Sequence, residues 1–169
     1  HGSATEDSHD GRAQSPPLTQ LLQDDLMPFE AAISTGKAAI MVSHLEIPGL
    51  TGDLPASLSS AAIDGLLRTD LGFEGLVISD ALNMKAIADR WSVEQSVVMT
   101  IGAGADLAIL GTLADVGPAF ASIDEAVYQG QLKVERVNDA ATNVLRAKKV
   151  NACTLVGRVR GVFNTVHDW

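Results

Sequence analysis

An aspartate follows an apolar run in the middle of the sequence. Asp80 comes after the segment 75–79, Gly-Leu-Val-Ile-Ser. A carboxylate at the end of such a run loses hydration unless it faces a polar edge of the fold or has a functional role. Asp80 is therefore the leading candidate for a site residue. The alternative is an aspartate that caps the turn after the run.

A second candidate lies near the start, where Asp7 and His9 flank a serine. A carboxylate two residues from an imidazole in a loop can bind it, fix its tautomer and raise its pKa, which makes the histidine a usable general acid. Loop histidines near aspartates are common, so the pair alone does not establish a site. A metal site built from His1, Asp7, His9 and Asp10 is disfavoured, because no second cluster of ligands accompanies it. The sequence predicts neither a metal nor a cofactor.

Other residues near these candidates carry weaker signals. His44 ends the apolar run 38–44, where it either lines the same edge as Asp80 or is a hydrogen-bonded strand end. Asn83 and Met84 follow Asp80 and fit a turn residue and a packing residue. The glycines of segment 102–104 do not form a phosphate cradle, since they follow a helical pattern and precede a strand.

Three short apolar runs without alternation predict strands that are covered on both faces, as in a parallel sheet. They are 38–44, 75–80 and 105–110. Helical spacing of apolar residues predicts helices between and after them. These helices are 15–36, broken or kinked at Pro28, and 59–72, 92–102, 115–129 and 133–149. Ser15 and Ser59 are expected to cap the first two, and Ser92 with Gln95 forms a capping box.

Strands that alternate with helices predict parallel βαβ units and an α/β fold. In such folds the functional groups lie at the carboxyl ends of the strands, so one edge should collect His44, Asp80 and Gly111. Residues 1–150 form the regular part. The segment 151–169 is a tail of ambiguous pattern.

Composition excludes several classes of protein. The chain has 169 residues, 46% of them hydrophobic, which suffices for a core. Its net charge of −9 repels nucleic acids and anionic membrane surfaces. The single cysteine, Cys153, cannot form an internal disulfide. No apolar run approaches the roughly 20 residues of a membrane span. The first residues also lack the pattern of a signal segment. Because the sequence does not begin with methionine, this second absence leaves the localisation open.

Several stretches resemble the bacterial β-N-acetylglucosaminidases of glycoside hydrolase family 3. His1-Gly2, followed by Asp7-Ser8-His9, resembles the end of a loop that has the sequence pattern K-H-F-P-G-H-G…D-S-H in this family. The segment 71–84, LGFEGLVISDALNM, looks like the family's nucleophile segment, and 102–106, GAGAD, like the strand that follows. The likeness runs in family order from His1 to about Val150.

The resemblance implies a partial (β/α)8 barrel of about three strands, the C-terminal part of the family's catalytic domain. It implies retaining hydrolysis of terminal β-linked N-acetylglucosamine in peptidoglycan or chitin fragments, with no cofactor. Asp80 would be the nucleophile and His9, oriented by Asp7, the acid and base. His1, His44 and Met84 would contact the sugar.

The resemblance also suggests that a longer parent chain is the enzyme and that this segment alone is inactive or nearly so. Its compartment is either the bacterial cytoplasm or the cell envelope. The two unpaired edges of a three-stranded sheet favour pairing with another chain.

Three other functions stay open. One is another family 3 activity such as β-glucosidase, and a second is a noncatalytic module that binds sugar. The third is a receiver domain that is phosphorylated on Asp80. It would need an acidic pair for Mg²⁺ after an earlier strand and a lysine after a later one, and neither follows the runs 38–44 and 105–110.

Overall fold

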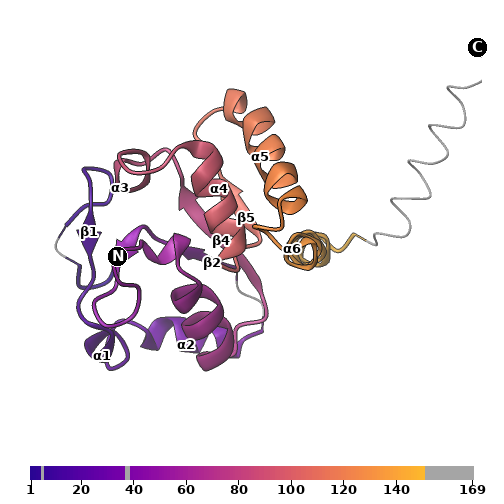
Figure 1. Ribbon diagram of the computed structural model, residues 1–169. Helices are drawn as coiled ribbons and strands as arrows, with labels where there is room; N and C mark the ends of the chain where they lie inside the picture. Colours follow the sequence, from indigo (N-terminus) through magenta and orange to yellow (C-terminus); the bar gives the residue numbers. More distant parts are fainter. Residues whose placement is uncertain (5, 37–38, 151–169) are drawn as a thin grey trace, which may run out of the picture.

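The computed structural model describes residues 1–4, 6–36 and 39–150. A three-stranded parallel sheet with the order β2-β4-β5 lies at its centre (Figure 1). These strands are β2 (Ala39–Val42), β4 (Leu76–Ala81) and β5 (Leu107–Ile109). A second, two-stranded parallel sheet pairs β1 (Ala13–Gln14) with β3 (Leu45–Glu46).

Helices connect the strands, so the chain is built from parallel βαβ units and the predicted α/β class is confirmed. The helices are α1 (Leu18–Leu21), α2 (Met27–Ser34), η1 (Ala56–Leu58), η2 (Ala61–Asp70), α3 (Lys85–Ala88), α4 (Val93–Gly102), η3 (Leu113–Asp115), α5 (Val116–Tyr128) and α6 (Val134–Ala147). Across the described ranges, no helix is both long enough and apolar enough to span a bilayer.

The sheet buries one face against helices. Ile40 of β2 and Val77 of β4 pack with Ile63 and Leu67 of η2 in one core cluster. Side chains alternate along a strand, so the residue after Ile40 points to the other face. That residue, Met41, is 52% exposed. With the order β2-β4-β5, strands β2 and β5 lie at the edges of the described sheet, and their pairing with another chain stays a prediction.

An ion-pair cluster closes the amino end of the sheet, below the start of β5. The carboxylate of Asp106 is fully buried and binds Arg68 and Arg136, each at 2.8 Å. It also accepts hydrogen bonds from the Asn143 amide (2.9 Å) and the Val77 N–H (3.0 Å). Asp106 therefore joins η2, β4 and α6 through four donors.

The starts of three helices test the N-cap residues that the sequence predicts. The capping box of α4 is confirmed, since Ser92 accepts from the Gln95 N–H and Gln95 accepts from the Ser92 N–H. The other two caps were wrong: no side-chain cap starts α1 or η2, and their N-cap residues are Pro17 and Ser60. The Ser15 hydroxyl instead donates to the Pro16 carbonyl, because Ser15 is held by the strand pairing.

Several short segments refine the predicted pattern. The helix predicted over 15–36 is divided into α1 and α2, in line with the break expected at Pro28, which occupies the first turn of α2 because its fixed φ suits that position. The helix η2 has π-type hydrogen bonding, and α3 and the β1–β3 pair are additional elements. The predicted tail 151–169, which includes Cys153, lies outside the described residues.

Candidate active site

Asp80 lies at the carboxyl end of the central strand, next to the last residue of β4. Its carboxylate is half-buried, and Oδ1 accepts a hydrogen bond from the Ala81 N–H at 2.7 Å. The hydroxyl of the preceding Ser79 donates to the Asp80 carbonyl and accepts from the Ile109 N–H in β5. The backbone of Asp80 is therefore fixed while its side chain lines a pocket of about 350 Å³.

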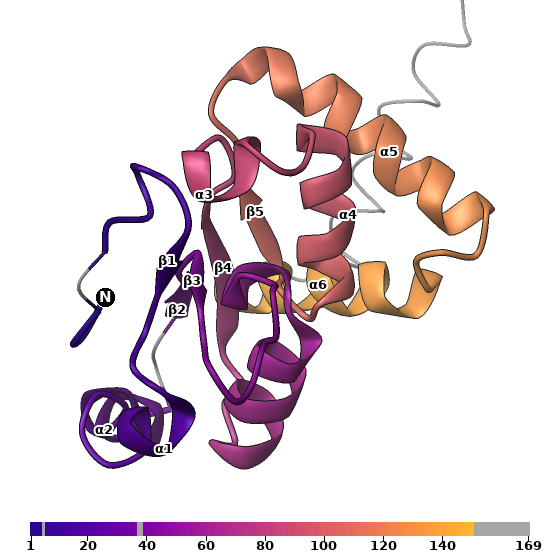
Figure 2. The same cartoon turned by 60° about the vertical axis from the view of Figure 1, so that its left-hand side comes forward.

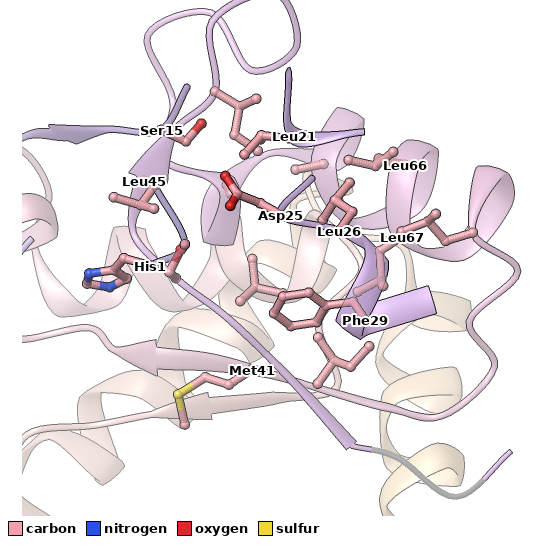
Figure 3. A pocket seen from close by; sticks show the side chains of 18 of the residues that line it. His1, Ser15, Leu21, Asp25, Leu26, Phe29, Met41, Leu45, Leu66 and Leu67 are labelled. Carbon is pink, nitrogen blue, oxygen red and sulfur yellow. The ribbon is translucent and has the colours of Figure 1, made fainter. Parts of the chain in front are cut away.

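The walls of this pocket are largely apolar and come from α1, α2, β2 and η2 (Figure 3). Phe29, Met41 and Leu66 are among them. Polar side chains are few, and one of them, Asp25, accepts hydrogen bonds from the Ser3 N–H and hydroxyl. Apolar walls offer a ligand no hydrogen bonds, so polar contacts in this pocket depend on its few polar residues, Asp80 among them.

Asp7 and His9 form the pair that their spacing predicted. Asp7 Oδ1 lies 2.8 Å from His9 Nδ1 and also accepts from the His9 N–H at 2.9 Å. With Nδ1 turned to the carboxylate, Nε2 is the ring nitrogen that can transfer a proton to another molecule. Both side chains are largely exposed.

The charges of this pair stabilise each other. The hydrogen bond to Asp7 raises the pKa of His9, and the charges of Asp7 and Asp80 act in the same direction. The hydrogen bond from the His9 N–H, followed by the imidazole contact, lowers the pKa of Asp7. The imidazole therefore stays protonated to a higher pH than an isolated histidine, as a general acid must.

The loop that carries this pair is anchored next to the segment after Asp80. Ser8 is fully buried, and its carbonyl accepts a hydrogen bond from the N–H of Ala86 in α3 at 3.3 Å. The carboxylate of Glu6 binds the Gln14 N–H and so closes the loop across its base. Figure 2 shows this N-terminal loop beside α3, at the end of the sheet where β4 and β5 finish.

His44 and Met84, both predicted to contact a sugar, have buried side chains. His44 Nδ1 lies 2.7 Å from the Ser57 hydroxyl, and Nε2 lies 3.0 Å from the Ala81 carbonyl. A carbonyl only accepts, so Nε2 carries the proton, and burial lowers the pKa of this imidazole. The structure thus places His44 behind the Asp80 strand end.

Met84 packs at the start of α3, where its N–H also donates to the Ala81 carbonyl. His1 is exposed, lines the pocket, and has Nε2 3.5 Å from the Ser8 hydroxyl. Of the three predicted sugar contacts, His1 is the one with an accessible side chain. No group of three or more potential metal ligands gathers within the described part of the chain.

A buried carboxylate that the sequence did not single out also lies at this end of the molecule. Glu46 of β3 binds Arg12 at 2.6 Å and Arg90 at 2.8 Å. The sequence signal for Glu46 is a charged residue between the apolar Leu45 and Ile47, comparable to the carboxylate of Asp80 beside an apolar run. The predicted apolar run 38–44 ends at His44, so Glu46 falls outside it.

Comparisons with known proteins agree on one family. Residues 1–147 match the family described as "Glycosyl hydrolase family 3 N terminal domain". Beta-hexosaminidase LpqI of Mycobacterium tuberculosis is 40% identical over 157 residues, covering 89% of this chain and 40% of that relative. A beta-hexosaminidase of Xanthomonas campestris pv. campestris is 38% identical over 111 residues, covering 65% and 33%. The chain therefore spans less than half the length of these relatives.

Solved structures show the same fold. The structure of M. tuberculosis LpqI matches with a TM-score of 0.85 and 40% identity, covering 89% of this chain and 46% of that one. A family 3 β-N-acetylglucosaminidase from Paenibacillus sp. str. FPU-7 matches with a TM-score of 0.82 and 34% identity, covering 86% and 28%. The described α/β fold thus corresponds to part of these larger chains.

Proposed function

Because the chain belongs to glycoside hydrolase family 3, we propose that the protein containing it releases terminal β-linked N-acetylglucosamine by retaining hydrolysis. The names of its relatives, beta-hexosaminidase and β-N-acetylglucosaminidase, support this choice of sugar. Residues 1–147 match the family's N-terminal domain, and within that domain we propose that residues 1–150 form the C-terminal part of the barrel.

The reaction proceeds in two displacements. The Asp80 carboxylate attacks the anomeric carbon while protonated His9 gives its proton to the departing glycosidic oxygen, which leaves a glycosyl ester on Asp80. His9, now neutral, removes a proton from water, and the resulting attack on the anomeric carbon releases the sugar and restores the carboxylate. Peptidoglycan or chitin fragments carry the required terminal residue.

The observation that carries this proposal is the Asp7–His9 contact of 2.8 Å beside the end of the Asp80 strand. Two carboxylates flank the bond in most retaining glycosidases. Here an imidazole with a raised pKa serves as the acid, and its charge is opposite to that of Asp80. The negative charge of Asp80 therefore helps to keep His9 protonated before the sugar is attacked.

The first test is Asp80→Ala in the full-length protein, assayed with a chromogenic β-N-acetylglucosaminide. We expect activity to fall at least about a thousandfold, because no other group forms the ester. Asp89→Ala is the matched control, since Asp89 is an exposed aspartate after α3, and it should keep near-normal activity. The proposal is contradicted if the wild type cleaves the corresponding chromogenic β-glucoside but not the β-N-acetylglucosaminide. It is also contradicted if the Asp80→Ala variant stays active.

The second test separates the acid from the nucleophile. His9→Gln should lose about a hundredfold or more on a substrate with a poor leaving group and far less on one with a good leaving group, which needs little protonation. Equal losses on both substrates would show that His9 is not the acid.

A further inference from the structure

Glu46 forms a buried bridge between two distant parts of the chain. Its side chain is 3% exposed, and its two oxygens bind different arginines: Oε2 binds Arg12 and Oε1 binds Arg90. Arg12 ends the loop that carries Asp7 and His9, whereas Arg90 follows α3, in the segment that continues from Asp80. One carboxylate therefore ties the two segments whose residues would have to meet at a sugar.

The two arginines depend on Glu46 to different degrees. Arg90 also donates to the Asp53 carbonyl at 2.7 Å and stacks 4.2 Å from the centre of the Trp91 ring. Arg12 has one further carboxylate nearby, Asp53 Oδ1 at 3.5 Å, and that side chain is 91% exposed. Removing the charge of Glu46 should therefore release Arg12 while Arg90 keeps its place.

Arg12 matters because of its position in the loop. The loop is anchored at Ser8, through the Ala86 N–H, and again at Arg12. His9 lies between these two anchors. The backbone is held again at β1, from Ala13 on, so losing the Arg12 bond loosens the short stretch between His9 and β1. A displacement of about 1 Å in a catalytic group reduces a rate by up to about a hundredfold.

We propose that Glu46 is a positioning residue, which holds His9 over the Asp80 strand end through its bond to Arg12. This inference rests on the proposed function, because it assigns Glu46 a role only in proton transfer by His9. Glu46 would not touch the sugar, and its loss would leave attack by Asp80 intact.

The test compares kcat/KM of the full-length protein for two β-N-acetylglucosaminides, one with a good and one with a poor leaving group. Glu46→Gln and Arg12→Gln should each lose about tenfold on the poor leaving group and less than about twofold on the good one. Arg12→Lys, which keeps a charge for Glu46, should recover part of the loss. Since Arg12 is largely exposed, its substitution tests the proposal even if Glu46→Gln folds poorly.

The matched control is Asp106→Asn, which neutralises another buried carboxylate between two arginines at the far end of the sheet. A merely structural effect lowers the amount of folded enzyme and therefore reduces the apparent kcat/KM for both substrates equally. Asp106→Asn should behave in that way. Equal losses in the Glu46 and Arg12 variants, or an unchanged Arg12→Gln, overturn the positioning role while leaving the proposed function standing. A wild type that releases no N-acetylglucosamine overturns both.

Discussion

The two ends of the sheet each bury a carboxylate between two arginines, but they enclose it differently. Asp106 accepts from four donors, and both of its arginines are about four-fifths buried. Among the described residues, the Glu46 carboxylate binds two arginines and no other donor, and Arg12 is 54% exposed. The same charge arrangement therefore joins strands and helices into the fold at one end, and holds a surface loop at the other.

This difference explains where the molecule can carry a catalytic group. At the Asp106 end, every described residue that binds the Asp106 carboxylate belongs to a helix or a strand. A movement of any one of these elements therefore breaks several contacts at once. At the Asp80 end the Asp7–His9 loop is held by a few separate bonds. We expect that each of these bonds can be removed without unfolding the sheet, which would make the contribution of the loop measurable.

The strongest test of the contrast is stability at the Asp106 end. Asp106→Asn leaves Arg68 and Arg136 without their counter-charge, and breaking a buried pair in this way lowers the free energy of unfolding by about 3 kcal/mol. Denaturant unfolding measures the loss. Glu46→Gln should lose less, because Arg12 can turn to solvent. A larger loss for Glu46→Gln would show that the Glu46 end, too, is part of the structural framework.

A second test probes the turn that precedes Asp106. Gly104 has a φ of +112°, and an added Cβ would overlap the carboxylate of Asp64. Gly104→Ala should therefore lower the free energy of unfolding by about 2 kcal/mol. The control is Gly65→Ala within η2, whose added Cβ would lie 3.8 Å from the Ser60 carbonyl oxygen, an ordinary contact, so it should be neutral or slightly stabilising. Equal effects of the two substitutions would contradict strain at Gly104.

At the Asp80 end the corresponding test is a pH profile. Asp7→Asn removes the charge and so lowers the pKa of His9 toward its ordinary value. The acid must be protonated, so kcat/KM on a poor leaving group should begin to fall at a lower pH than in the wild type, with a loss of about tenfold on the alkaline side. The loss should shrink at acidic pH, where His9 is protonated in both proteins. If the alkaline limb of the pH profile lies at the same pH in both proteins, Asp7 does not set the pKa of His9.

Much of the fold was predictable because its signals are local. Apolar runs gave the strands β2, β4 and β5, and the Ser92 capping box gave the start of α4. The placement of Asp80 at a strand end was predicted in the same way, from one carboxylate after an apolar run. The Asp7–His9 pair needed only a spacing of two residues.

The remaining features depend on contacts between residues far apart in the sequence. Glu46 meets Arg12 across 34 residues and Arg90 across 44, and no pattern within one element encodes such pairs. The cap predicted at Ser15 is wrong because its N–H donates to the Glu46 carbonyl beside the β1–β3 pair, which is also a long-range contact. His44 could not be assigned for the same reason, because its partners Ser57 and Ala81 come from other segments.

The smallest expected effect concerns His44 and the pH dependence of stability. Burial lowers its pKa in the fold, so below pH 6.5 the unfolded chain binds a proton that the folded chain does not, and the free energy of unfolding falls as the pH decreases. With an unfolded pKa of 6.5, this loss between pH 7.5 and 6 is at most about 0.8 kcal/mol.

His44→Gln isolates this contribution, because the amide nitrogen can still donate to the Ala81 carbonyl without titrating. The variant should lose less stability than the wild type between pH 7.5 and 6, as measured by denaturant unfolding at each pH. His9 opposes the effect, since its raised pKa stabilises the fold at lower pH, but it is present in both proteins and cancels in the difference. If the free energy of unfolding had the same pH dependence in both proteins, His44 would not be held neutral behind Asp80. The Asp80 end would then accommodate a buried charge as readily as the Asp106 end.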